Sequence, residues 1–327
     1  MNWKEEDLLL ELIKKMVKSN KMLTKGYRVF YCLFSTIFWN IRFFFDRLLE
    51  PKEIYGCCFV FTTLLGRVRK NNWGDDLNEY LFTELTLKKI RFVPFNQLYF
   101  CPNVERYSLI GSIIGDFNLD NTIIYGSGAI TSNPELKGRP KKVLSVRGPL
   151  TRDVLLKNGI ECPPIYGDPA LLVPLIYNPQ TKFGDKIGVI PHYRTLESNW
   201  IESLKKDNEV LIIDMSRYEK WTDIIDSIVR CKMILSESLH GLIIAESYRI
   251  PSLWVEFIPH NYSWEWEFKF IDFYKSIGKN NPKCYKIYNG YSPEEILDKT
   301  KKWIPGNIDY DSMIKAFPFE LKGILKK

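Results

Sequence analysis

The second half of the chain alternates short apolar runs with amphipathic segments. Four runs begin at residues 186, 209, 232 and 252 (KIGVIP, EVLIID, KMILS and SLWVEF), and stretches of 10 to 13 residues with helical spacing separate them. Short, nearly all-apolar strands between such helices are typical of a parallel sheet that is covered on both faces. We therefore predict a doubly wound α/β domain in this half.

The first half shows the same alternation less regularly. The apolar run at 54–65 predicts a buried strand, and a turn containing Gly and Asn leads from it into a helix that begins near residue 75. Further strands are predicted at 121–128 and 141–146, and the second is followed by a helix that ends at Gly159. This half predicts a second doubly wound domain.

A polar segment with Pro and Gly, NPQTKFGD at 178–185, separates the two halves. We therefore divide the chain into an N-terminal extension over 1–50, a Rossmann-like domain over 51–178, and a second Rossmann-like domain over 179–327 that ends in a helical tail. A chain of 327 residues is long enough for two such cores. In sheets of this kind, ligands bind beyond the carboxyl ends of the strands.

The N-terminal extension joins a basic stretch to an aromatic one. From Lys14 to Arg28 the chain carries six positive charges and no acid, and residues 29–41 are apolar and rich in aromatic side chains. That core is too short to span a bilayer of ~30 Å, for which ~20 residues are needed. Two interpretations stay open: an anchor on an anionic membrane surface, or a helix that packs on the first domain with its aromatic side buried.

Composition narrows the possible partners. Hydrophobic residues make up 45% of the chain and charged residues 26%, which is typical of a globular protein and excludes wholesale disorder. The formal net charge of +7 suits an anionic substrate or an acidic membrane, and it is also an ordinary solubility device. Because no basic run is interleaved with aromatic residues in the pattern of nucleic-acid binders, we expect no nucleic-acid partner.

Cysteine and histidine usage argues against a metal site. The seven Cys residues are scattered without C-x-x-C spacing, and none of the three His residues lies within helical reach of another. We expect reduced thiols and no metal. The N-terminus, MNWKEEDLLL, lacks the pattern of a secretory signal, so we expect a cytoplasmic protein, peripheral at the inner face of the cell membrane if the extension is an anchor.

Arg147 stands where a predicted strand meets a helix, in the segment SVRGPLTRD. Gly148 permits a close approach at this point, and Pro149 suits the first turn of a helix. An arginine at the edge of the sheet can grip phosphate or carboxylate with its planar guanidinium, beside a helix N-terminus. The alternative is a structural ion pair with an acid such as Asp168.

His240 follows the strand KMILS at the start of a predicted helix. Hydroxyl groups at Ser236 and Ser238 and the small Gly241 lie beside it in the sequence. Because a helix N-terminus disfavours imidazolium and favours anions, the ring is placed to stay neutral and to exchange a proton next to a bound phosphate. The alternative is a histidine that caps backbone amides.

Other polar residues and glycines follow predicted strands as well. NNWGDD lacks the spacing of dinucleotide and P-loop fingerprints and indicates only a tight turn that exposes polar groups. The segment IPHY fits either a substrate contact or a hydrogen bond within its own loop. Our candidate substrate-binding residues at these strand ends are Asn72, Gly74, Asp75, Gly126, Ser127, Gly128, Asp168, His192, Arg194, Ser236, Ser238 and Gly241.

Taken in order, these segments resemble the polysaccharide pyruvyl transferases, particularly the branch that decorates bacterial exopolysaccharides. The resemblance covers roughly residues 55 to 280 and rests on NNWGDDLNEYL, IGSII with YGSG, SVRGPLTRDVL, GDPALLVP, IGVIPHY, SLHGLIIAESYRIPSLW and EFKFIDFYKSIG. It implies a GT-B-like fold, in which two Rossmann-type domains face a cleft. It also implies phosphoenolpyruvate as the donor, with no other cofactor. The implied acceptor is a sugar of a capsular polysaccharide or exopolysaccharide, or of its lipid-linked precursor, which gains a pyruvate ketal.

Residue by residue, the resemblance assigns two catalytic groups. The arginine of the family's R-G segment falls on Arg147, as an anion clamp, and its L-H histidine falls on His240, as a general acid or base. Many members carry a second arginine two residues before this histidine, where the present chain has Ser238. A second cation must then come from elsewhere, and Lys269 or Arg194 is our candidate.

Two other functions stay open. A sugar-nucleotide glycosyltransferase shares the architecture, and many retaining ones carry Glu-x7-Glu in the second domain, whereas Glu237 and Glu246 here are one residue out of register. A catalytically inactive scaffold for polysaccharide assembly is the other alternative, because Ser238 weakens the donor site.

Overall fold

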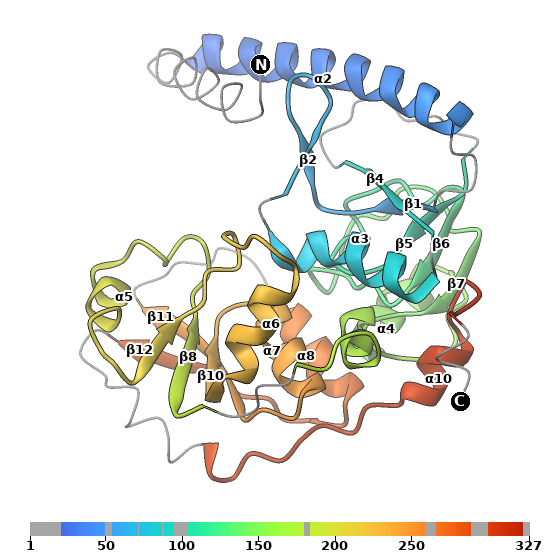
Figure 1. Cartoon of the computed structure of the whole chain (residues 1–327). Coiled ribbons are helices and arrows are strands. Elements are labelled where there is room, and N and C mark those ends of the chain that lie inside the picture. Colours follow the sequence, from blue (N-terminus) through green and yellow to red (C-terminus); the bar gives the residue numbers. More distant parts are fainter. Residues whose placement is uncertain are drawn as a thin grey trace.

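The computed structural model describes residues 21–49, 54–70, 72–86, 88–94, 104–179, 184–258, 266–288 and 300–322 (Figure 1). Two five-stranded sheets, each with all its strands parallel, dominate this part of the chain. A short antiparallel hairpin accompanies them. The α/β class with parallel sheets, which the alternation of apolar runs predicts, is confirmed.

The first sheet has the strand order β4-β1-β5-β6-β7. Its carboxyl edge carries the loops that follow β6 and β7, which are neighbours in the sheet. The elements of this half are β1 (Ile54–Cys57), α3 (Trp73–Thr86), β4 (Ile90–Val93), β5 (Arg106–Ser108), β6 (Thr122–Tyr125), β7 (Lys142–Ser145), α4 (Pro149–Lys157) and the 3₁₀ helix η1 (Pro169–Leu175).

The prediction of one strand over 54–65 is wrong beyond Cys57. The chain leaves the sheet there and forms a hairpin of β2 (Phe61–Thr62) and β3 (Val68–Arg69). Thr63 closes the hairpin turn, because its N–H donates to the carbonyl of Arg67 at 2.7 Å and its Oγ1 accepts from the Arg67 N–H at 3.2 Å. A continuous apolar run gives no sign of such a turn.

The second sheet has the order β12-β11-β10-β8-β9, and four of its strands are the four predicted apolar runs. Ile190 pairs with Ser236 and Val189 pairs with Ile212, so the carboxyl ends of β8, β10 and β9 lie side by side. The elements are β8 (Lys186–Ile190), α5 (Asn199–Leu204), β9 (Val210–Ile212), α6 (Thr222–Val229), β10 (Cys231–Ser236), α7 (Leu239–Ser247), β11 (Ser252–Ile258), α8 (Glu267–Ser276) and β12 (Tyr285–Tyr288).

Helix α7 lies at the centre of the molecule. Nearly all of its residues are buried, as expected for a helix that is apolar around its whole circumference, and it contacts η1, α6, β10 and β11. A single hydrophobic cluster includes Trp73 and Tyr125 from the first half and Leu242 and Phe270 from the second. The two halves therefore share a continuous core, and the domain boundary near residue 178 stays a prediction.

The C-terminal part of the chain returns to the first half. Helix α8 packs against α4, and α10 (Tyr310–Lys315) lies near β7 at the opposite end of the molecule from β12 (Figure 1). The Tyr125 hydroxyl donates to the carbonyl of Met313 at 2.9 Å, and the rings of Phe82 and Phe317 stack with centroids 5.7 Å apart. The predicted helical tail thus contributes to the core of the first half.

Helix α2 (Lys21–Leu49) forms the outermost layer, beside the β2–β3 hairpin (Figure 1). The Tyr31 hydroxyl donates to the carbonyl of Thr62 at 2.6 Å, and Phe43 lies between the rings of Trp39 and Tyr55, each 5.0 Å away. The rest of the predicted extension, residues 1–20 and 50, lies outside the described residues. None of the helices in the described ranges combines the length and apolarity that crossing a membrane requires.

Candidate active site

Arg147 follows β7 and is completely buried. Its Nε donates to Asp272 at 3.1 Å, its Nη1 to the hydroxyl of Ser112 at 2.5 Å, and its Nη2 to the carbonyl of Ala129 at 2.6 Å. A side chain at Gly128 would collide with the guanidinium group. Arg147 therefore has the acidic partner that the structural interpretation expects, but this acid is Asp272 on α8 and not Asp168.

Asp272 fixes the position of Arg147 and also caps α4. Its carboxylate accepts hydrogen bonds from the Thr151 N–H at 3.0 Å and from the Thr151 hydroxyl at 2.6 Å. A buried ion pair of this kind needs such additional hydrogen bonds to offset the loss of solvation. Since each guanidinium nitrogen of Arg147 uses one N–H here, one N–H on Nη1 and one on Nη2 have no acceptor among the described residues.

His240 lies in the first turn of α7, and its ring contacts the backbone of α3. A side chain at Gly74 would collide with the imidazole, so only glycine permits this approach. The buried Nε2 atom has no hydrogen-bond partner among the described residues. Burial, together with the positive charges of Lys269 and Arg147, lowers the pKa of His240 to about 3. The ring is therefore neutral at pH 7.

Lys269 approaches the same place from α8. Burial, reinforced by the Arg147 charge and opposed by Asp75, lowers the pKa of its ammonium group to about 8. The ammonium lies 5.2 Å from the centroid of the Phe270 ring, and within the described ranges it makes no ion pair. Lys269 is therefore a mostly protonated cation at pH 7 that has not been neutralised by a close carboxylate.

Two buried carboxyl groups complete the cluster. Burial, together with the negative charges of Asp76 and Asp168, raises the pKa of Asp75 to about 8. Two groups oppose this shift: the Lys269 ammonium, and the Asn72 amide, which donates a hydrogen bond to Asp75 at 2.5 Å. Burial also raises the pKa of Asp168 to about 6, against its hydrogen bond from the Ala170 N–H and the charge of Arg147. The second carboxyl oxygen of Asp168 has no partner among the described residues.

The fold therefore gathers five titratable groups from five elements. They are Asp75 in α3, Arg147 after β7, Asp168 before η1, His240 in α7 and Lys269 in α8. At pH 7 the set contains two cations, one neutral imidazole, one largely protonated carboxyl and one largely ionised one. The N–H groups of Arg147 and the Nε2 atom of His240 that have no partner among the described residues are available to a ligand that brings negative charge.

The N-terminus of α3 is held by the second half of the chain. The Trp73 N–H donates to the carbonyl of Met215 at 2.9 Å, and the Trp73 indole donates to the carbonyl of Trp221 at 2.7 Å. The Tyr218 hydroxyl donates to Asp76 at 2.7 Å. These contacts place Asp75 next to residues of α7 and α8 that are far away in the sequence.

Four predicted residues of the first half have structural contacts. Gly126 adopts φ 81° against Pro169, and the buried Ser127 hydroxyl lies 2.7 Å from that of Ser108. Gly128 makes room for Arg147, and Asn72 orients Asp75. These groups shape the site without offering a free polar side chain toward it.

The loop after β8 is tied to the end of β10. The His192 N–H donates to Glu237 at 2.9 Å, and His192 Nδ1 accepts from the Arg194 N–H at 3.3 Å. Arg194 is exposed and its Nε donates to the Tyr193 hydroxyl at 3.1 Å. Of the two candidates for the second cation, Lys269 is the one that lies within the electrostatic reach of Arg147 and His240.

The turn before α7 holds its serines in a local network. Ser236 Oγ donates to the carbonyl of Ser238 at 2.8 Å and accepts from the Ser238 N–H at 3.0 Å. A side chain at Gly241 would meet Ser236 Oγ and Ile190. Ser238 is the N-cap of α7, but its hydroxyl makes no capping bond.

Two buried glutamates, Glu237 and Glu246, connect segments of the second half through hydrogen bonds. Glu237 accepts from the N–H groups of His192 at 2.9 Å and Phe257 at 2.7 Å and from the Thr195 hydroxyl. Glu246 binds the Lys279 ammonium, the Trp303 indole at 3.2 Å and the Gly306 N–H at 3.0 Å. Both carboxylates are thus occupied by contacts that join segments of the fold.

Asp272 is the functional residue that the sequence patterns do not single out. It lies in EFKFIDFYKS between the buried Phe270 and Phe273, so a charged residue occupies a buried position of an otherwise apolar helix face. Buried acids are rare unless they are paired, and this mismatch is the signal that could have identified it.

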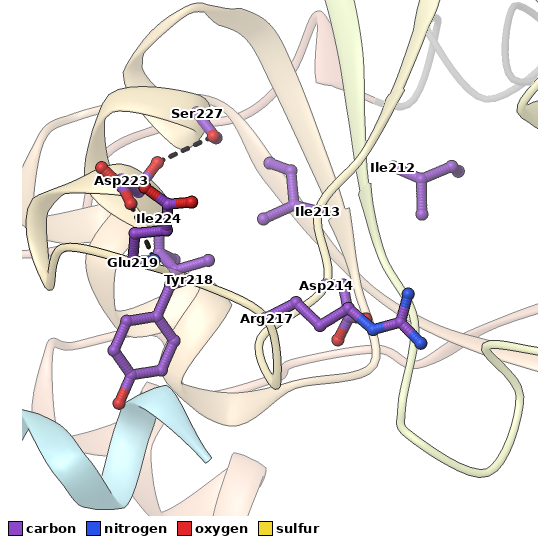
Figure 2. A pocket seen from close by; sticks show the side chains of 9 residues that line it. All are labelled: Ile212, Ile213, Asp214, Arg217, Tyr218, Glu219, Asp223, Ile224 and Ser227. Carbon is purple, nitrogen blue, oxygen red and sulfur yellow. Dashed lines mark hydrogen bonds and ion pairs between the residues drawn. The ribbon is translucent and has the colours of Figure 1, made fainter. Parts of the chain in front are cut away.

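A pocket of about 540 Å³ opens at the carboxyl end of β9 (Figure 2). Arg217, Tyr218, Asp214 and Asp223 are among its lining residues. Asp214 accepts hydrogen bonds from the N–H and hydroxyl of Ser216, and Asp223 accepts from two backbone N–H groups at 3.0 and 2.7 Å. Asp214 and Asp223 thus bind groups that neighbour them in the chain. Tyr218 connects the pocket to α3 through its hydrogen bond to Asp76.

In a parallel α/β fold, a cluster of charged and titratable side chains beyond the strand ends is the usual place for an active site. Comparison with known families is more specific. Residues 100–258 match the family described as polysaccharide pyruvyl transferase. That family implies a transferase that acts on polysaccharide. The matched region contains Arg147, Asp168 and His240, while Asp75 and Lys269 flank it.

Two individual proteins are also similar to this chain. An uncharacterized protein of Acanthamoeba polyphaga mimivirus is 29% identical over 247 residues, which cover 72% of this chain and 78% of the relative. The crystal structure of an uncharacterized protein from Klebsiella pneumoniae aligns with 76% of this chain and 98% of its own, at 14% identity and a TM-score of 0.38.

Proposed function

We propose that the protein transfers the enolpyruvyl group of phosphoenolpyruvate to two hydroxyls of a sugar, with release of phosphate and formation of a pyruvate ketal. The acceptor is a sugar of a capsular polysaccharide or exopolysaccharide, or of its lipid-linked precursor. The donor lies between the strand ends of the two halves, in a GT-B-like arrangement. The observation that carries the proposal is a pair of cations, the buried Arg147 and the half-buried Lys269, beside the unpartnered Nε2 of His240.

Donor binding uses the two cations together. The N–H groups of Arg147 that have no acceptor among the described residues bind carboxylate or phosphate oxygens in the planar manner of a guanidinium group. Lys269 supplies the positive charge that many family members carry at the position of Ser238. Because both cations lie in a buried site, their attraction for a trianionic donor is screened less than at the surface.

Two neutral groups carry the proton transfers. Ketal formation begins when a proton reaches the methylene carbon of the donor, which leaves positive charge at the adjacent carbon for a sugar oxygen to attack. Asp75, protonated at pH 7, is the better proton donor, and neutral His240 is the better acceptor of the sugar hydroxyl proton. A positioned acid or base of this kind typically contributes about 10²–10⁴ in rate.

The remaining steps balance the reaction. The bridging C–O bond to phosphate breaks, inorganic phosphate leaves, and the second sugar hydroxyl adds to the same carbon and loses its proton. One donor and one diol thus give one ketal and one phosphate. The bound phosphate raises the proton affinity of His240 through its negative charge, so the ring becomes a stronger base once the donor is present.

The two alternative functions make different demands on the site. A retaining glycosyltransferase of the Glu-x7-Glu type requires glutamates that are free to bind a sugar nucleotide, whereas Glu237 and Glu246 are occupied by contacts within the fold. An inactive scaffold would keep the cleft but would have lost affinity for the donor. One set of binding and turnover measurements distinguishes the two alternatives from the proposed function.

The test compares ligands and variants of the full chain. Thermal shift with phosphoenolpyruvate and with UDP-sugars measures donor preference, and phosphate release in the presence of candidate acceptors measures turnover. We expect Lys269→Met to weaken binding of phosphoenolpyruvate about tenfold or more, because a charge-assisted hydrogen bond contributes roughly 1.5–3 kcal/mol. Lys269→Arg keeps the charge and should retain most of the affinity.

The exposed Lys302 provides the control, since Lys302→Met removes the same charge away from the site. Equal affinity for phosphoenolpyruvate in the wild type and in Lys269→Met would contradict the donor site. A larger stabilisation by a UDP-sugar would favour the glycosyltransferase. Weak stabilisation by phosphoenolpyruvate, together with no phosphate release with any acceptor tried, would favour the scaffold.

A further inference from the structure

Helix α2 exposes a continuous apolar stripe to solvent. Among the described residues, eleven of the eighteen exposed large hydrophobic side chains lie on this helix. They recur at helical spacing over five turns. These residues, which we call the α2 stripe, are Val29, Phe30, Leu33, Phe34, Ile37, Phe38, Ile41, Phe44, Phe45, Leu48 and Leu49.

The opposite face of α2 is the one that contacts the protein, and it is partly polar. Ser35 and Thr36 are buried there, and their hydroxyls donate to the carbonyl of Cys32 at 3.2 and 2.6 Å. Trp39 and Phe43 are the large side chains that enter the fold. A helix that only covered a domain would turn its most apolar face inward. In α2 most of the aromatic side chains point the other way.

The charge of the segment indicates what covers the stripe. Helix α2 contains five basic residues and one acid, and that acid, Asp46, is paired with Arg91 of the first sheet at 3.0 Å. Lys25 and Arg42 are exposed. The chain from Lys14 to Arg28 is basic throughout. A surface that is apolar in its centre and positive at its borders complements an anionic bilayer, whose headgroups attract cations and whose acyl boundary accepts aromatic side chains.

We propose that α2 binds in the plane of an anionic phospholipid bilayer, with the α2 stripe inserted at the boundary between headgroups and acyl chains. The inner face keeps its contacts with Tyr55 and with the β2–β3 hairpin, so the rest of the fold is held against the membrane. The stripe runs along nearly the whole helix, as an in-plane orientation requires. This inference does not depend on the chemistry of the active site.

Vesicle flotation of the full chain tests the proposal. The vesicles contain either phosphatidylcholine alone or phosphatidylcholine with about one third phosphatidylserine. We expect binding to the anionic vesicles, with weaker binding to the neutral ones and at high salt. The double substitution Phe44→Ser and Phe45→Ser should reduce the bound fraction at least tenfold, because two exposed aromatic anchors are lost.

A matched double substitution, Leu156→Ser and Ile304→Ser, removes two exposed apolar side chains elsewhere and should leave vesicle binding unchanged. Circular dichroism of both variants checks that each is folded. Vesicle binding that survives in the α2 double variant would overturn the proposal, as would equal binding to neutral and anionic vesicles. A wild type that ignores vesicles but forms a dimer, which the α2 variant dissociates, would assign the stripe to a second copy of the chain instead.

Discussion

The active-site cluster and helix α2 depart from the usual distribution of side chains in opposite directions. Arg147 and Asp272 are charged and completely buried, whereas Phe44 and Phe45 are aromatic and more than half exposed. Either arrangement is unfavourable for folding taken alone, because burial desolvates charge and exposure hydrates apolar surface. Each is therefore a place where the sequence serves something other than stability.

The two regions differ in how the fold holds them. The buried charges are fixed by contacts from α4, α8 and the loop after β6, so removing one partner leaves the other without compensation. The α2 stripe is supported only by its own helix, so removing its side chains leaves the fold intact. Substitutions in the cluster should therefore affect stability and activity together, while those in the stripe should affect membrane binding alone.

The largest effect is expected from Asp272→Ala. This change leaves Arg147 buried without its acid and removes the cap of α4, so the free energy of unfolding should fall by about 3–5 kcal/mol. Urea denaturation of the purified chain measures the loss. The double variant Arg147→Met with Asp272→Leu should recover much of the stability, because no unpaired charge remains, yet it should release no phosphate.

Asp309→Ala separates the loss of a cap from the loss of an ion pair. Asp309 is exposed and caps α10 through a hydrogen bond from the Ser312 N–H at 3.0 Å, so its substitution should cost only about 1 kcal/mol. A loss for Asp272→Ala no larger than this would contradict the view that the ion pair with Arg147 is energetically critical.

Substitutions on the two faces of α2 should have smaller effects on the free energy of unfolding than Asp272→Ala. Phe43 lies inside the first half against Trp39 and Tyr55, so Phe43→Ala should lower the free energy of unfolding by about 3 kcal/mol. The adjacent Phe44 is 60% exposed, and Phe44→Ala should change the free energy of unfolding by less than about 0.5 kcal/mol. Urea denaturation of both variants measures the difference, and equal losses would mean that the stripe is packed after all.

Much of the fold is predictable because the parallel strands of the second half are apolar on both faces. The runs that contain Ile187, Met233 and Leu253 are short and bounded by polar turns, which fixes their assignment. The run after Ile54 is equally apolar, but its residues beyond Cys57 form a hairpin that covers α2. Hydrophobicity alone does not distinguish a buried strand from an apolar turn that another helix covers.

The sequence also places Arg147 and His240 at strand ends, since topology alone brings such ends to one edge. It does not reveal that the partner of Arg147 is Asp272, because that contact spans 125 positions and depends on α8 crossing to the first half. Nor does it reveal that Asp75 holds a proton at pH 7, because that state depends on burial by segments from both halves. Contacts between distant segments are what a pattern along the chain lacks.

The expected change in stability at Asp75 depends on pH. The folded chain binds the Asp75 proton up to about pH 8, whereas an unfolded aspartate releases it near pH 3.8. Between these values the folded state holds the extra proton, so the stability of the wild type falls as the pH rises, relative to a variant with an amide at this position. Asp75→Asn should therefore match the wild type near pH 4 and exceed it by several kcal/mol at pH 8, because each unit of the pKa shift corresponds to about 1.4 kcal/mol.

Urea denaturation at the two pH values measures this difference, with Asp153→Asn, an exposed carboxyl on α4, as the control. The same variant should lose phosphate release, because an amide cannot protonate the donor. A gain in stability combined with a loss of turnover would show that the buried carboxyl is retained for chemistry at the expense of folding. An Asp75→Asn protein with the pH dependence of the wild type would mean that Asp75 is ionised in the folded chain, and His240 would then be the remaining candidate for the proton donor.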